Sequence, residues 1–187
     1  MFRRARPADA ARIMEIIRQA QAQMRALGSL QWQDGYPARA DIDRDIARGY
    51  GYVFEKSDAA ENPAAAETPQ KYDKGTVPGG VIAYGAAVFD GEPAYGAIDG
   101  AWLTGGDYVV LHRLAVADGE KGRGVAAEFM RRTEALARGR GVGSFRVDTN
   151  FDNRYMLRML ERLRFAYCGK IIYESGERLA FEKPLEA

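Results

Sequence analysis

Apolar residues recur along the chain at two different spacings, and these spacings divide it into helices and strands. Ile13, Ile17 and Ala20 lie three or four positions apart, as on one face of an amphipathic helix. Pro7 suits the first turn of that helix, and Gly28 suits its end. The same spacing predicts four helices, over 7–27, 41–47, 125–139 and 153–163.

Shorter apolar runs bounded by turn residues predict the strands. These runs cover 2–6, 50–56, 81–89, 109–116, 145–149, 166–172 and 178–183. The order is one strand, two helices, three strands, a helix, a strand, a helix and two strands. It predicts an α/β fold in which a mixed sheet is covered by helices on both faces. We expect a single domain over residues 1–187.

The segment 57–77 shows neither spacing. It holds Pro63, Pro69 and the run Ala64-Ala65-Ala66 among polar residues. A stretch of this length without periodicity, placed between two strands, predicts a flexible hairpin insertion. We assign no function to it.

Composition narrows the class of protein. The 187 residues are 47% hydrophobic and 28% charged, which is typical of a globular domain. Lys and Arg number 27 against 26 Asp and Glu, so there is no basic excess for broad nucleic-acid binding. No apolar run is long enough to span a membrane, and Cys168, as the single cysteine, excludes an intramolecular disulfide. We therefore expect a cytoplasmic protein without nucleic-acid or membrane partners.

The stretch with the clearest chemical use runs from Val109 to Ala127. It reads as an apolar strand, a loop containing Gly122 and Gly124, and the first turn of a helix. The backbone N–H groups of such a loop and of a helix N-terminus together form a site for a phosphate. The strand carries His112, the only histidine of the chain. A plain turn before a helix would leave the same short pattern, so the loop alone is weak evidence.

The loop resembles the signature of the GNAT acyltransferases, which reads Gln/Arg-x-x-Gly-x-Gly/Ala. Lys121, Gly124 and Ala126 occupy its three slots. The strand 114–116 is similar to the family strand that pairs with the pantetheine arm of coenzyme A, and 153–165 is similar to a later family motif. The resemblance covers nearly the whole chain and implies a GNAT-like, mainly antiparallel sheet of about seven strands. Segments 31–37, 41–46 and 102–116 also resemble a bacterial GNAT subgroup whose acceptors are mostly unassigned.

The resemblance implies transfer of an acetyl group from acetyl-CoA to a primary amine, by direct attack in a ternary complex. The acceptor would be a small-molecule amine or a protein amine, and a homodimer would be in keeping with the family. No metal is expected. The residues implied to hold the cofactor are Leu114, Ala115, Val116, Lys121, Gly122, Arg123, Gly124, Val125, Ala126, Ala127 and Asn153. Asn153 is equally suited to cap the helix that follows it.

Acyl transfer to an amine requires a base and an oxyanion donor. An alkyl ammonium has a pKa of about 10 and must lose a proton before it can attack. His112 is a candidate base, and the strand period of two puts it on the same face as Leu114. By resemblance, the backbone N–H of Leu114 would stabilise the oxyanion. The alternative for His112 is a structural histidine beside the sheet.

One departure from the family concerns the proton donor to the departing thiolate. Leu160 occupies the slot where many members carry a tyrosine. Tyr155, Tyr167 or a water molecule could substitute. The departure keeps a second hypothesis open, namely a non-catalytic acyl-CoA-binding sensor or interaction module.

The acceptor pocket is expected to use loop residues. Trp32, Asp34, Tyr36 and Trp102 lie in loops that line this pocket in the family. The aromatic rings would give the pocket shape, and Asp34 would attract a cationic amine. Alternatively, Trp32 and Tyr36 hold their loop to the core.

Overall fold

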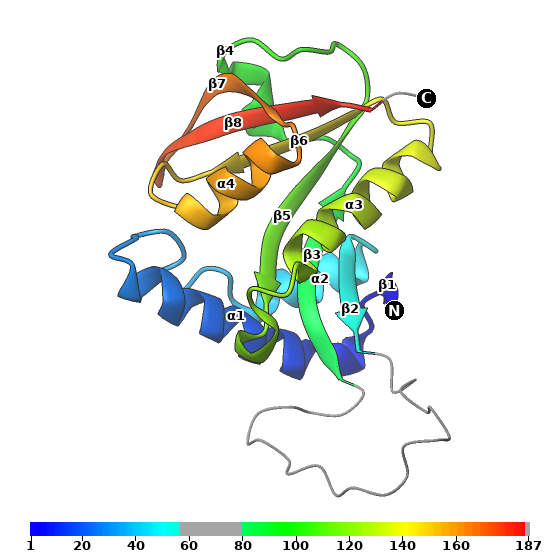
Figure 1. The fold of residues 1–187 in the computed structure, drawn as a ribbon, viewed down its shortest axis with the longest axis vertical. Coiled ribbons are helices and arrows are strands. Elements are labelled where there is room, and N and C mark those ends of the chain that lie inside the picture. Colours follow the sequence, from blue (N-terminus) through cyan, green and yellow to red (C-terminus); the bar gives the residue numbers. More distant parts are fainter. Residues whose placement is uncertain (57–79, 186–187) are drawn as a thin grey trace, which may run out of the picture.

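The computed structural model describes residues 1–56 and 80–185 (Figure 1). The predicted insertion at 57–77 lies outside these residues. The helices are α1 (Ala10–Ala26), α2 (Arg39–Ala47), α3 (Val125–Arg138) and α4 (Arg154–Arg162). The strands are β1 (Phe2–Arg4), β2 (Gly51–Glu55), β3 (Val81–Val88), β4 (Asp99–Gly100), β5 (Tyr108–Val116), β6 (Ser144–Thr149), β7 (Ala166–Tyr173) and β8 (Gly176–Pro184).

The strands form one sheet with the order β1-β2-β3-β5-β6-β8-β7-β4. Only β5 and β6 pair in parallel, and the other neighbours are antiparallel. The prediction of a mixed, mainly antiparallel sheet is therefore confirmed. The described part of the chain has eight strands rather than seven, because β4 adds a two-residue edge strand on β7 that is too short to show an apolar period.

Two hydrophobic clusters lie on opposite faces of the sheet. Ile13 of α1 and Ile42 of α2 pack in the cluster that contains Tyr84 of β3. Phe129 of α3 and Leu160 of α4 pack in the other cluster, with Ala83 and Ala87 of β3. Because successive side chains of a strand point to opposite faces, α1 and α2 cover one face and α3 and α4 the other. This confirms the predicted helices on both faces (Figure 1).

The sheet opens at its centre. The parallel pairing of β5 with β6 is confined to 108–110 against 144–146. Beyond these residues the two strands diverge. The partner strand β3 also shifts register against β5, since Ala86 faces His112 whereas Tyr84 faces Ala115. Two residues of β5, Arg113 and Leu114, thus oppose one residue of β3, which is a β-bulge.

Candidate active site

A cavity of about 1000 Å³ lies where β5 and β6 part. Residues 111–114 of β5 form one wall, and 147–149 of β6 together with the following Asn150 form another. The loop after α1, the helix α2, the turn 90–93, the start of α4 and the hairpin between β7 and β8 also contribute to the walls. The predicted residues His112 and Leu114 are therefore brought together in one concave site.

The bulge in β5 is centred on Arg113, which adopts a left-handed conformation with φ of 57°. This conformation costs a residue with a side chain about 1–2 kcal/mol. Contacts offset the cost, because the guanidinium makes two bonds of 2.7 and 2.8 Å to the buried Asp45 carboxylate of α2. It also donates to the Tyr36 hydroxyl at 2.6 Å, and Tyr84 donates to Asp45 at 2.6 Å. The ion pair fixes α2 and the bulge together beside Leu114.

His112 faces a carboxylate that the sequence did not single out. Its Nε2 lies 3.2 Å from Oε2 of Glu92, and both side chains line the cavity while remaining mostly buried. Contact with His112 is the main cause that lowers the pKa of Glu92, against the opposing effect of burial. Glu92 sits in a turn just before Pro93. Its position as the residue that caps the 3-10 helix Pro93–Ala97 is the one local signal that distinguishes it.

A second carboxylate reaches the cavity from β6. Asp148 accepts a hydrogen bond from the Tyr95 hydroxyl at 2.6 Å and a longer one from Tyr173 at 3.5 Å. Burial raises the pKa of both tyrosines, and the Asp148 charge raises it further. Both hydroxyls therefore stay protonated and act as donors. Both Tyr173 and Asp148 line the cavity. The sequence analysis predicted neither of them as a site residue.

Neither tyrosine that was considered as proton donor to the thiolate lines the cavity. Leu160, in the family's tyrosine slot, is fully buried in the core. Tyr155 and Tyr167 are 59% and 56% exposed, and neither lines the cavity. The thiol of Cys168 is buried in β7 outside the cavity, and burial raises its pKa.

The glycine loop contains two backbone positions with positive φ. Gly122 and Gly124 both have positive φ, of 77° and 78°, which favours glycine at these positions. Gly124 precedes Val125, where α3 begins, and the first N–H groups of a helix have no intrahelical partner. Lys121 bonds to Asp118 at 2.5 Å, and Arg123 is exposed. The loop 121–127 does not line the cavity, and neither do Ala115 and Val116, the last two residues of β5.

Asn153 has a structural function that the structure shows directly. It caps α4, since its Oδ1 accepts from the Met156 N–H at 3.2 Å. Its side chain also lines the cavity. Because capping uses only the oxygen, the amide NH₂ is free of protein partners in the described part of the chain. The two expectations for Asn153, helix cap and ligand contact, are thus compatible.

The acceptor-loop residues divide into two groups. Trp32, Asp34 and Tyr36 line the cavity. Trp102 does not: its indole Nε1 donates to the Tyr95 carbonyl at 2.9 Å, and its ring covers the Arg146 guanidinium at 4.4 Å. Trp102 was assigned to the pocket from its place in a loop, and the buried Arg146 beside it is the physical reason it lies elsewhere.

Two further features follow from the described residues. None of their helices is both long and apolar enough to serve as a transmembrane span. Within 1–56 and 80–185, no group of three or more His, Cys, Asp or Glu side chains has an arrangement that could hold a metal ion.

Comparison with known proteins identifies the family. The model of the Acetyltransferase (GNAT) family matches residues 24–165. A crystal structure of a GNAT-family acetyltransferase from Streptococcus agalactiae 2603 is 33% identical, with a TM-score of 0.81, and the match covers 100% of this chain and 96% of that one. No curated protein matches the sequence.

More distant solved structures share the fold. A GNAT-family acetyltransferase from Listeria monocytogenes 4b F2365 is 20% identical, with a TM-score of 0.70 and coverage of 99% of this chain and 94% of that one. The NatC complex bound to Gag peptide and CoA is 12% identical, with a TM-score of 0.61 and coverage of 100% and 98%. The family model spans most of the chain and includes the walls of the cavity on β5 and β6. The chain therefore belongs to the GNAT family of acetyltransferases.

Proposed function

We propose that this protein transfers the acetyl group of acetyl-CoA to a primary amine by direct attack in a ternary complex. The observation that carries the proposal is the opening between β5 and β6, which brings His112 and Leu114 to one cavity. The acceptor class is a small-molecule amine or a protein amine.

The strand β5 and the loop after it support acetyl-CoA as the acyl donor. The pantetheine arm would bind along 114–116, where the strand edge is released from β6. The pyrophosphate would bind the N–H groups of 121–127 at the start of α3. Asn153 would contact the amides of the arm with its free NH₂ group. The NatC complex, which has this fold, holds CoA.

The attack step uses His112 and Leu114, which lie at the bulge in β5. His112 takes a proton from the acceptor ammonium, and the amine nitrogen attacks the thioester carbonyl. The carbonyl oxygen becomes an anion and accepts from the backbone N–H of Leu114. A bulge frees the strand residues beside it from ladder bonds, which makes such an N–H available. The nitrogen of the tetrahedral intermediate then loses its second proton to water, the carbonyl re-forms, and the carbon–sulfur bond breaks with its electron pair leaving on sulfur.

The departing thiolate requires no protein acid in this proposal. Leu160 has no proton to give, and Tyr155 and Tyr167 do not line the cavity. A simple thiol has a pKa of about 8.5, so a thiolate is an adequate leaving group near neutral pH. Water then supplies its proton.

The acceptor would enter past the loop that holds Trp32, Asp34 and Tyr36. Asp34 is exposed at the cavity edge and has no cationic partner among the described residues. It is therefore available to attract a cationic amine. The two aromatic rings would shape the entrance.

The test is release of free thiol from acetyl-CoA across a panel of amines, preceded by a calorimetric titration with acetyl-CoA. Saturable binding together with thiol release that depends on one class of amine supports the proposal. Leu160 favours one alternative, a non-catalytic acyl-CoA sensor or interaction module. Saturable binding with no amine-dependent release in the whole panel would support that alternative instead.

A further inference from the structure

The side chain of Glu92 is held on both of its oxygens. Oε1 accepts from the Ala94 N–H at 3.3 Å, which caps the 3-10 helix Pro93–Ala97. Oε2 lies 3.2 Å from Nε2 of His112. The carboxylate therefore cannot rotate away from the imidazole without losing its contact with the backbone.

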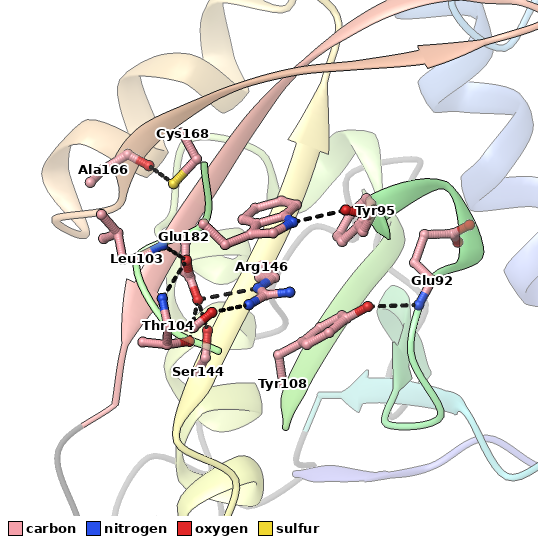
Figure 2. Close-up of polar contacts among 11 residues, drawn as sticks. Glu92, Tyr95, Leu103, Thr104, Tyr108, Ser144, Arg146, Ala166, Cys168 and Glu182 are labelled. Atoms are coloured by element: carbon pink, nitrogen blue, oxygen red, sulfur yellow. Dashed lines mark hydrogen bonds and ion pairs between the residues drawn. The ribbon is translucent and has the colours of Figure 1, made fainter. Parts of the chain in front are cut away.

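The backbone of Glu92 is fixed as well. Its N–H donates to the Tyr108 hydroxyl at 3.1 Å (Figure 2). The Tyr108 ring stacks on the Arg146 guanidinium at 3.9 Å, and Arg146 pairs with the fully buried Glu182 at 3.1 Å. Glu92 is thus anchored to a buried network whose residues do not line the cavity.

This arrangement selects one form of the neutral imidazole. The pKa of Glu92 lies below its usual range, so the group is an ionised carboxylate that can only accept a hydrogen bond. A ring hydrogen on the nitrogen that faces it, Nε2, is then favoured, because a lone pair there would point at the negative charge of the carboxylate. The lone pair is left on Nδ1.

The remaining nitrogen is accessible. No described residue bonds Nδ1 of His112, and it is not among the buried polar atoms without a partner. The side chain lines the cavity. Nδ1 is therefore not buried, and it belongs to a side chain that lines the cavity in which an acceptor would bind.

From this geometry we infer that Glu92 is a positioning residue for His112: it holds the imidazole in the Nε2–H form and leaves Nδ1 as the atom that takes the proton from the acceptor amine. The inference rests on the proposed function, in which His112 is the base. When Nδ1 is protonated, the imidazolium stands against the Glu92 carboxylate, and this contact stabilises the charge that develops during the attack.

The direct test is ¹⁵N NMR of protein labelled in histidine. The chain has one histidine, so the spectrum holds a single pair of ring nitrogens. At about pH 8.5, roughly two units above the ordinary histidine pKa, a free ring is neutral. We expect Nε2 fully protonated and Nδ1 unprotonated in the wild type, and a mixture of the two forms in Glu92→Gln. Identical nitrogen shifts in the two proteins, or a mixture in the wild type, would overturn the inference.

Two further variants make the result specific. Asp90→Asn removes a nearby cavity carboxylate whose partner is the Tyr50 hydroxyl, and it should leave the histidine shifts at their wild-type values. An equal effect of both substitutions would refute a specific role for Glu92. Tyr108→Phe keeps the ring over Arg146 but removes the acceptor for the Glu92 N–H, and it should shift the histidine signals in the same direction as Glu92→Gln. No shift in Tyr108→Phe would contradict the anchoring.

Steady-state kinetics provide a second test once an acceptor is known. Glu92→Gln should lower kcat roughly 10- to 100-fold, a part of the 10²–10⁴ that a general base contributes. The KM for the acceptor should change little, and Glu92→Asp, which keeps the charge, should recover part of the loss. An unchanged kcat in Glu92→Gln would contradict the inference. The NMR result needs no acceptor, so it can fail or succeed independently of the proposed transfer reaction.

Discussion

The buried pair of Arg146 and Glu182 offers the sharpest test of how this fold is held together. The Glu182 carboxylate is fully buried, and it accepts from the Ser144 hydroxyl at 2.5 Å and from the Thr104 hydroxyl at 2.6 Å (Figure 2). It also accepts from Arg146 at 3.1 Å and from the N–H of Leu103. Burial alone would raise the pKa of Glu182, but these donors and the arginine charge together lower it below its usual range.

Glu182→Gln is the informative change because it keeps the shape and removes the charge. The Arg146 guanidinium, whose side chain is 6% exposed, then loses its counter-charge in the interior. Removing one partner of a buried pair typically costs about 3–5 kcal/mol. For a chain of this size, each kcal/mol lowers Tm by about 2–4 °C, so the predicted drop is roughly 6–20 °C. Urea unfolding at pH 7 followed by circular dichroism measures the free energy directly.

The pH dependence has a definite sign. Because the folded-state pKa of Glu182 is lowered, its contribution to stability is present above the ordinary carboxyl pKa of about 4.3 and is lost as the pH falls through the folded value. The difference between wild type and Glu182→Gln should therefore be largest near neutral pH and should shrink below about pH 4.

The matched control is Glu177→Gln. Glu177 pairs with Lys170 at 2.9 Å, but both side chains are largely exposed, so the change should cost less than about 1 kcal/mol. A loss below about 1 kcal/mol for Glu182→Gln, or equal losses for the two variants, would refute the reasoning that the buried charges depend on each other.

Three other substitutions test the site. His112→Ala should lower turnover by roughly 10²- to 10⁴-fold while calorimetry shows little change in acetyl-CoA affinity; turnover equal to wild type across pH would remove His112 from the reaction. Gly124→Ala places a side chain at φ of 78°, so it should destabilise the loop by about 1–2 kcal/mol and weaken the binding of acetyl-CoA. An unchanged affinity by calorimetric titration would contradict the proposal that this loop binds the pyrophosphate. Asp45→Asn leaves the mostly buried Arg113 without its carboxylate, so it should lower the free energy of unfolding by about 3 kcal/mol; full stability in urea would show that the pair does not hold the bulge.

The periodicity of apolar residues was sufficient to predict most of the fold. Ile13, Ile17 and Ala20 are all buried on α1, as their spacing predicted. The strand β4 escaped prediction because a two-residue element has no period, and its pairing with β7 is a long-range contact. The first helix begins as a 3-10 turn over Pro7–Asp9 before α1, a local detail that spacing cannot resolve.

The site was predictable only where a motif carries it. His112 and the glycine loop stand in one continuous stretch, so their neighbourhood was visible in the sequence. Asp148 and Tyr95 are joined across 53 positions, and no local pattern predicts such a contact. Glu92 lies in a turn whose residues read as loop. Trp102 lies outside the cavity because it packs on Arg146, whose burial between two rings only the structure shows.

The central claim is that an acetyl group passes from acetyl-CoA to an amine at the cavity that holds His112. The most direct measurement uses acetyl-CoA labelled with ¹³C at the thioester carbonyl, incubated with the protein and a panel of amines and followed by NMR. We expect the label to move from thioester to amide with one class of amine, and His112→Ala to slow the transfer roughly 10²- to 10⁴-fold. A label that stays in the thioester with every amine, or that moves equally fast in His112→Ala, would contradict the account.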